Sequence, residues 1–286
     1  MAVVAAIEEC APAKINLSLH VLGRRADGYH ELESLVVFAR TGDRIAAHAA
    51  DELKLDLSGP FGDALKGEGD NLVLRAARFL ASELGREACG HLQLEKNLPV
   101  ASGIGGGSAD AAATLRALAR LWGADIDARR LAAIALSLGA DVPVCLEARP
   151  AFMRGVGERV ERLDGLPDFA LVLVNPGIAV PTASVFRELA APPLAEDFAA
   201  SEAPKVSTLD ALVAWLHVHG NDLEPPARRI APAIGDVILA IAATSGCRLA
   251  RMSGSGATCF GLYANESEAR AAAAALARPG WWVAAG

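Results

Sequence analysis

The sequence has little of what marks a membrane, secreted or nucleic-acid-binding protein. Its five cysteines are scattered, odd in number and without CxxC spacing, which argues against a disulfide framework and against zinc. No apolar run approaches a membrane span, and the first ten residues carry acids where a signal peptide carries a basic region. The formal net charge is −7 and no basic run is present, which argues against a nucleic-acid partner. We therefore expect a soluble cytoplasmic protein without a nucleic-acid partner.

Lysine is also scarce, because the chain has five lysines against 22 arginines. One of them, Lys14, lies in the segment PAKINL, where Ile15 and Leu17 alternate with it as in a strand and Asn16 follows it. A lysine on a half-exposed strand is usually just solvated. Since arginine fills most basic positions here, however, Lys14 suits a place that needs a compact point charge.

Four glycines gather in the stretch LPVASGIGGGSADAAATLRALARLW, which runs from Leu98 to Trp122. The residues before it alternate as a strand over Gly90 to Lys96, and apolar residues at helical spacing follow from about Ser108. A glycine loop that leads into a helix N-terminus can hold an anion, most often a phosphate. The alternative is a tight strand-to-helix turn with Ser108 as the N-cap.

The common nucleotide-binding patterns do not fit this loop. No Lys-Ser/Thr pair follows the glycines as in a Walker loop, and GxGxxG started at Gly103 or Gly105 meets Ser108 or Asp110 at its third glycine. The loop would therefore have to hold phosphate through its backbone.

Hydrophobic periodicity predicts a mixture of strands and helices. Strands are expected at 13–21, 31–39, 44–50, 53–57 and 90–96, from Phe169 onward, and on both sides of the SGSGAT segment at 253–258. Helices are expected at 71–84, 108–122, 127–138, 182–189, 208–217, 234–244 and 266–276. A domain boundary near Asp164 divides the chain into residues 1–163 and 164–286.

Two further segments carry weaker signals. The SGSGAT segment can aim several backbone N–H groups at one anion. The segment LGADVPV leaves a helix through Gly139 and places Asp141 just beyond it, where a solvated loop aspartate is the ordinary interpretation.

PAKINL, PVASGIGGGSAD and SGSGATCF resemble, in order and spacing, the three motifs of the galactokinase, homoserine kinase, mevalonate kinase and phosphomevalonate kinase (GHMP) superfamily. The segments RADGYHEL, GADVPV and NDLE resemble one branch of it, whose members phosphorylate the 2-hydroxyl of a cytidine-diphosphate derivative of a sugar alcohol on the non-mevalonate route to isoprenoids. The resemblance implies an ATP- and Mg²⁺-dependent kinase of the α+β class. Its N-terminal domain would contain a left-handed βαβ unit, its C-terminal domain would be ferredoxin-like, and the active site would lie between them.

By motif position, the resemblance also implies roles for individual residues. Lys14 and Asp141 would form the catalytic pair, with Asp141 acting either as a true base or as an electrostatic partner. Asn16, Tyr29, His30 and Phe186 would bind the substrate, with the cytosine stacked between Tyr29 and Phe186. The ATP-binding residues would be Pro99, Val100, Ala101, Ser102, Gly103, Ile104, Gly105, Gly106, Gly107, Ser108 and Ala109, together with Asn71 and Lys96. The loop of Ser253, Gly254, Ser255 and Gly256 would lie on the phosphate side. No metal ligand is certain, and Ser108 is a candidate.

Two other interpretations remain open at this point. A sister kinase for mevalonate, its phosphate or homoserine would keep the glycine loop but gives no reason for Tyr29 and His30. A nucleotide-binding sensor without turnover would not need Lys14, Asn16, Ser108 and Asp141 together. For Phe186, a place in the core of a short helix is the alternative to substrate contact.

Overall fold

The computed structural model describes residues 6–67, 71–196, 198 and 200–286. The chain forms two compact units whose segments interleave: 1–13, 42–100 and 105–148 make the first, and 14–41, 101–104 and 149–286 make the second. Strands β1 (Ile7–Asn16) and β3 (His30–His48) contribute to both units. The predicted boundary near Asp164 divides the chain into two consecutive segments, and it remains a prediction. Within the described residues, no helix combines the length and apolarity needed to cross a bilayer.

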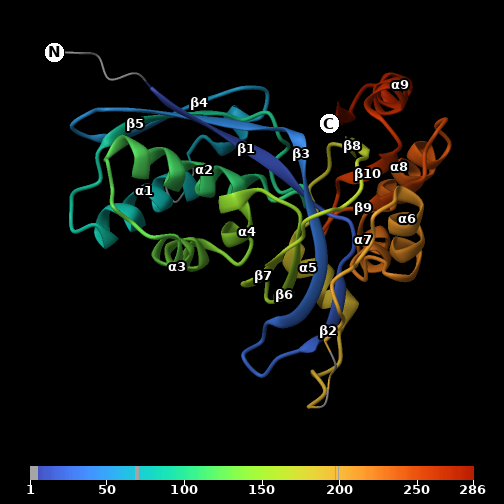
Figure 1. Cartoon of the computed structure of the whole chain (residues 1–286). Helices are drawn as coiled ribbons and strands as arrows, with labels where there is room; N and C mark the ends of the chain where they lie inside the picture. The colour runs from blue at the N-terminus through green and yellow to red at the C-terminus, as the bar shows by residue number, and fades with distance from the viewer. Residues whose placement is uncertain (1–5, 68–70, 197, 199) are drawn as a thin grey trace. The chain divides into compact units, whose positions relative to one another are not determined.

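The first unit contains a βαβ arrangement. Strand β4 (Leu53–Ser58) pairs in parallel with β5 (Gly90–Glu95), and helix α1 (Leu72–Glu83) lies between them in the chain, after the short 3₁₀ helix η1 (Gly62–Leu65). The second half of β3 pairs antiparallel with β5. Helices α2 (Gly106–Leu121), α3 (Ala128–Leu138) and α4 (Val142–Glu147) complete the unit and lie with α1 on one side of the strands (Figure 1).

In the second unit, the first half of β3 pairs antiparallel with β2 (His20–Arg24) and with β6 (Ala151–Gly155), which in turn pairs with β7 (Arg159–Arg162). A separate antiparallel sheet has the order β11-β8-β10-β9, formed by β8 (Ala170–Asn175), β9 (Leu249–Met252), β10 (Cys259–Tyr263) and β11 (Trp282–Ala285). If these four strands are numbered 1 to 4 along the chain, their order in the sheet is 4-1-3-2. Helices precede the second strand, β9, and the fourth strand, β11. This is the predicted ferredoxin-like βαββαβ arrangement.

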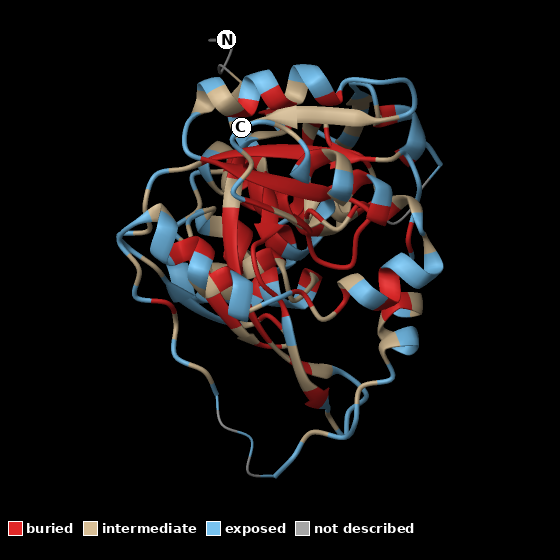
Figure 2. Cartoon of the chain, turned by 90° about the vertical axis from the view of Figure 1, so that its right-hand side faces the viewer, coloured by how far each residue is buried: buried red, intermediate tan, exposed pale blue. Residues whose placement is uncertain are grey.

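The helices of the second unit are α5 (Thr182–Leu189), α6 (Leu209–Val218), α7 (Glu224–Ile230), α8 (Ala233–Ala242) and α9 (Glu266–Leu276). Helices α8 and α9 pack on the ferredoxin-like sheet and share its apolar core, which includes Val172, Val237 and Cys259. Figure 2 shows the buried residues along the strands and the exposed ones on the outward faces of the helices.

Several predicted elements differ from the structure. The predicted strand 13–21 is wrong in its bounds, because β1 ends at Asn16 and β2 starts at His20. The predicted strands 31–39 and 44–50 form one continuous strand, β3. The strand passes through Gly42. A glycine is needed there because a Cβ would lie 2.5 Å from the Ala11 carbonyl oxygen on β1. Helix α4 starts directly after Asp141, where a loop was expected, and β6, β7, β11 and α7 were not predicted.

Candidate active site

Three segments that are far apart in the sequence meet in the second unit. The Lys14 backbone N–H donates to the Ile104 carbonyl at 2.9 Å, which joins the end of β1 to the glycine loop. The Asn16 N–H donates to Ser253 Oγ at 3.0 Å, and that hydroxyl donates to the Gly103 carbonyl at 3.1 Å. The three kinase-like motifs are therefore hydrogen-bonded to one another.

The contact between the glycine loop and the 253–256 segment is made backbone to backbone. A Cβ on Gly103 would lie 2.6 Å from the Ser253 carbonyl oxygen and from the Gly256 nitrogen, and its φ is +75°. A Cβ on Gly254 would lie 2.7 Å from the Gly103 oxygen. Both positions therefore require glycine, for close approach and for the left-handed backbone conformation.

Helix α2 begins directly at the end of the glycine loop. Its N-cap is Gly105, with φ +63°, so the predicted helix start near Ser108 is two residues late and Ser108 is not the N-cap. Gly107 is exposed in the first turn and Ser108 is half-buried. The first N–H groups of a helix have no partner within it, so this end can hold an anion.

The other residues of the predicted ATP loop differ in burial. Pro99, Ser102, Ile104 and Ala109 are buried, Val100, Gly103, Gly105 and Gly106 are half-buried, and Ala101 is exposed. Buried residues on both sides of the glycines anchor the loop, and the exposed positions lie between these anchors.

Lys96, in the first unit, bridges two carboxylates. Its Nζ is 2.5 Å from Asp43 Oδ2 and 2.6 Å from Asp110 Oδ2, and all three side chains are at most 3% exposed. Asp43 Oδ1 accepts from the backbone N–H groups of Asn97 and Leu98 at 2.6 and 2.8 Å. The lysine cluster, defined as Asp43, Lys96 and Asp110, thus supports the start of the glycine loop.

Burial controls the protonation of the lysine cluster. Loss of solvent, together with the nearby Asp43 charge, raises the pKa of Asp110 to about 8, although Lys96 pulls it downward. Burial opposes the charge on Lys96, but the two carboxylates outweigh it and raise the pKa of the ammonium. Among the described residues, Asp110 Oδ1 has no hydrogen-bond partner. The sequence analysis missed Asp43 and Asp110; the position of Asp110 one residue after the loop was the available signal.

Asn71 is placed as a helix cap. Its Oδ1 accepts from the Val73 N–H at 2.9 Å, so the side chain terminates α1, and the residue is 7% exposed. Its predicted contribution to ATP binding remains a prediction.

The predicted substrate residues belong to the second unit. Asn16 Nδ2 donates to Ser34 Oγ at 2.7 Å, which fixes the amide on neighbouring strands. The His30 ring stacks on Phe186, with centroids 4.6 Å apart and planes 26° from parallel. Burial, with a smaller effect of Arg24, lowers the pKa of His30, which favours the neutral ring. Tyr29, by contrast, is 63% exposed.

The 253–256 segment is held by a residue that the sequence analysis did not place in the site. Asn221 Nδ2 donates to the carbonyls of Met252 and Gly254, both at 2.9 Å. Ser255 Oγ lies 2.8 Å from Thr182 Oγ1 at the start of α5. Asn221 begins the NDLE segment, so the resemblance of that segment was the available signal.

The predicted catalytic residues are placed in different units. Lys14 is 3% exposed at the end of β1 in the second unit. Asp141 is half-buried at the start of α4 in the first unit. Their pairing remains a prediction.

The described residues contain no cluster of three or more His, Cys, Asp or Glu side chains that could hold a metal ion. Mg²⁺ does not need such a cage in a kinase, because it keeps several waters and binds through substrate phosphates with one or two protein oxygens. The half-buried Ser108 hydroxyl in the first turn of α2 fits that requirement.

Comparison with known proteins identifies the family. Residues 71–149 match the model of the GHMP kinases N terminal domain, and residues 198–280 match the GHMP kinases C terminal model. The 4-diphosphocytidyl-2-C-methyl-D-erythritol kinase of Parvibaculum lavamentivorans is 63% identical over 97% of this chain and 96% of its own length. The enzyme of the same name from Paramagnetospirillum magneticum is 52% identical over 96% of this chain and 95% of its own.

Solved structures agree with these matches. A crystal structure of 4-(cytidine 5'-diphospho)-2C-methyl-D-erythritol kinase superposes with a TM-score of 0.76 at 38% identity, over 97% of this chain and 98% of that one. A homoserine kinase from Cytophaga hutchinsonii superposes with a TM-score of 0.70 at 20% identity, over 100% and 96% of the two chains, which shows a shared fold. The chain thus belongs to the GHMP kinases and, within them, to the family of 4-diphosphocytidyl-2-C-methyl-D-erythritol kinases.

Proposed function

We propose that the chain transfers the γ-phosphoryl group of ATP to the 2-hydroxyl of 4-diphosphocytidyl-2-C-methyl-D-erythritol, in the cytoplasm and without an obligate protein partner. The reaction belongs to the non-mevalonate route to isoprenoid precursors. The observation that carries the proposal is the hydrogen-bonded junction of Asn16, Ser253 and Gly103, which joins three motifs of a family whose relatives carry this activity in their names.

The glycine loop and the first turn of α2 bind the ATP phosphates in this proposal. Phosphoryl transfer through a loose transition state needs positioning and charge neutralisation more than covalent participation by the protein. Backbone N–H groups at Gly106 and Gly107 supply donors that need no reorganisation during the reaction. When bound, Mg²⁺ neutralises charge on the phosphate oxygens, and Ser108 is the loop hydroxyl placed to contribute a ligand.

The acceptor hydroxyl is handled by Lys14 and Asp141. The ammonium of Lys14 stabilises negative charge near the attacking oxygen. Asp141 orients the hydroxyl and accepts its proton late in the reaction, as a base or as an electrostatic partner. Asn16, fixed by Ser34, lies two residues after Lys14, whose N–H bonds the Ile104 carbonyl, and it orients the acceptor.

The cytosine is recognised by the aromatic residues of the second unit. His30 stacks on Phe186 and covers one face of the phenyl ring. In this proposal the cytosine lies between Phe186 and the exposed Tyr29 ring. Stacking on an aromatic side chain contributes about 1 to 3 kcal/mol per base. A neutral His30 can both donate a hydrogen bond to the polar edge of the cytosine and accept one from it.

A coupled assay of ADP release tests the proposal. The purified protein is incubated with ATP and Mg²⁺ and, in parallel, with the cytidyl substrate, mevalonate, phosphomevalonate or homoserine. Turnover of the cytidyl substrate alone is expected. Preferred turnover of another acceptor would identify a sister kinase, and ATP binding without any turnover would identify a sensor.

Two variants test the catalytic pair in the same assay. Lys14→Ala and Asp141→Asn should each lower kcat by about 100-fold or more while the Kd of ATP changes little, because both act on the transition state. Calorimetric titration with ATP and a thermal unfolding curve serve as controls for binding and folding. Near-normal turnover in a folded variant would remove that residue from the mechanism.

A further inference from the structure

The turn that carries Tyr29 connects β2 and β3 and is closed by its own side chains. The Arg25 N–H donates to the Tyr29 carbonyl at 2.7 Å, and the Tyr29 N–H donates to Asp27 Oδ1 at 3.1 Å. The Arg25 guanidinium forms an ion pair with Asp27 Oδ2 at 3.0 Å. Because Tyr29 is largely exposed, this backbone turn, and not packing of the ring, decides where its side chain lies.

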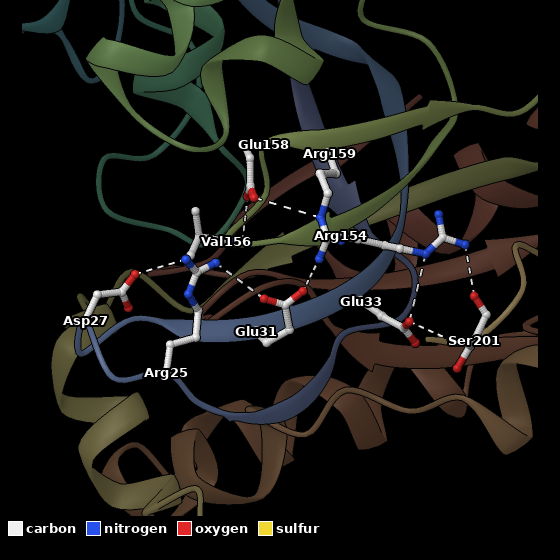
Figure 3. Close-up of polar contacts among 9 residues, drawn as sticks. All are labelled: Arg25, Asp27, Glu31, Glu33, Arg154, Val156, Glu158, Arg159 and Ser201. Carbon is white, nitrogen blue, oxygen red and sulfur yellow. Dashed lines mark hydrogen bonds and ion pairs between the residues drawn. The ribbon is translucent and has the colours of Figure 1, made fainter. Parts of the chain in front are cut away.

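Glu31, two residues after Tyr29, joins this turn to the sheet. Its side chain is only 5% exposed, and Oε2 lies 3.4 Å from Arg25 Nη1. Its other oxygen, Oε1, accepts from Arg159 Nη2 on β7. Figure 3 shows the carboxylate between the two guanidinium groups. We call Arg25, Glu31 and Arg159 the glutamate cluster.

The far end of the glutamate cluster is held by the turn between β6 and β7. Glu158 Oε2 accepts from the Val156 N–H at 2.7 Å, and Oε1 lies 3.9 Å from Arg159 Nε (Figure 3). β6 itself pairs with β3, with Gly155 opposite Leu32. Arg159 is therefore anchored to the same sheet that carries Glu31, whereas Arg25 is the link to Asp27 in the turn.

We infer that Glu31 is a positioning residue for recognition of the cytidyl group. Held between Arg25 and Arg159, it fixes the turn of residues 25–29 and so sets the orientation of Tyr29. His30 has an independent support in its stacking on Phe186, so Tyr29 is the side chain that depends on the cluster. The inference rests on the proposed function, because it assumes that Tyr29 contacts the substrate.

The chain contains a matched control on the same strand. Glu33 lies on the same face of β3, is 3% exposed at its side chain and lies 3.9 Å from Arg154 Nε. Glu33 Oε1 accepts from the Ser201 N–H at 2.7 Å (Figure 3). Arg154 also donates to Glu161 on β7 at 2.7 Å. The Glu33 carboxylate is as buried as that of Glu31 and also faces an arginine, but that arginine is 19% exposed, and Glu33 bonds the segment at Ser201 instead of the turn.

Steady-state kinetics of Glu31→Gln and Glu33→Gln test the inference. For Glu31→Gln, the KM of the cytidyl substrate should rise about 10-fold or more, while the KM of ATP stays within about 2-fold, because only base recognition loses its support. For Glu33→Gln, both KM values should stay within about 2-fold. Equal KM changes in the two variants, or an unchanged cytidyl KM in Glu31→Gln, would overturn the inference.

Arg25→Met decides the question if Glu31→Gln does not fold. It removes the link to the turn at a partly exposed side chain and leaves Glu31 paired with Arg159. The cytidyl KM should rise in Arg25→Met and stay unchanged in the control Arg154→Met, and an unchanged KM in both would overturn the inference. A wild-type protein without turnover of the cytidyl substrate would instead overturn the proposed function.

Discussion

The lysine cluster and the glutamate cluster are built from the same kinds of group in opposite proportions. The lysine cluster in the first unit places one cation between two carboxylates, with every side chain at most 3% exposed. The glutamate cluster in the second unit places one carboxylate between two guanidinium groups that are 35% and 56% exposed. The first is closed to solvent, whereas the second buries only its central charge.

This difference separates two uses of ion pairs. Where all the charges are buried, loss of hydration dominates, and it drives the pKa of Asp110 to about 8 in spite of the adjacent ammonium. Where the arginines remain in contact with water, their charges are screened and the pairs contribute little free energy, so what they supply is geometry. We therefore expect the lysine cluster to govern stability and the glutamate cluster to govern substrate recognition.

The largest effect is expected for Lys96→Met. Removing the ammonium leaves Asp43 and Asp110 buried without a cation, which should lower the free energy of unfolding by about 3 to 5 kcal/mol. Urea denaturation measures it. Lys54→Met, which removes an exposed lysine paired with Glu52 at 3.2 Å, is the control and should cost less than about 1 kcal/mol. Equal losses in the two variants would contradict the view that burial sets the difference.

An intermediate effect is expected when the pH dependence of the free energy of unfolding is compared between the wild type and Asp110→Asn. The pKa of Asp110 is higher in the folded state than the ordinary value of 3.8, so its contribution to stability is complete at low pH and is lost as pH rises through about 8. Between pH 6 and pH 9 the wild type should lose more than about 1 kcal/mol relative to Asp110→Asn. Paired denaturation curves at the two pH values measure this. Parallel pH profiles for the two proteins would show that Asp110 ionises normally in the fold.

The smallest effect is expected for Arg159→Lys. The variant keeps the positive charge at a half-exposed position and loses only the forked geometry, so the free energy of unfolding should change by less than about 1 kcal/mol. Thermal and urea unfolding measure it, with the wild type as reference. A loss as large as that of Lys96→Met would mean that the two clusters do not differ in the way their exposure indicates.

The local sequence determined a large part of this structure. Helices 182–189 and 266–276 lie at the predicted residues, because their apolar spacing and end signals are contained within the segments themselves. The glycine loop also leads from a strand into a helix as predicted, although α2 starts two residues earlier. The three motifs, together with the RADGYHEL segment, were sufficient to indicate the family.

Tertiary structure decided what depends on partners distant in the chain. β3 runs unbroken through Gly42, whose backbone lies too close to β1 to leave room for a side chain, and a local pattern does not reveal this approach. Asp43 lies 53 residues before Lys96, and Glu31 lies 128 residues before Arg159. Any of the chain's many arginines and acids could have formed such pairs. Only the folded sheets, which bring these particular strands together and exclude water from some of their side chains, select the pairs that form and set which of them titrate.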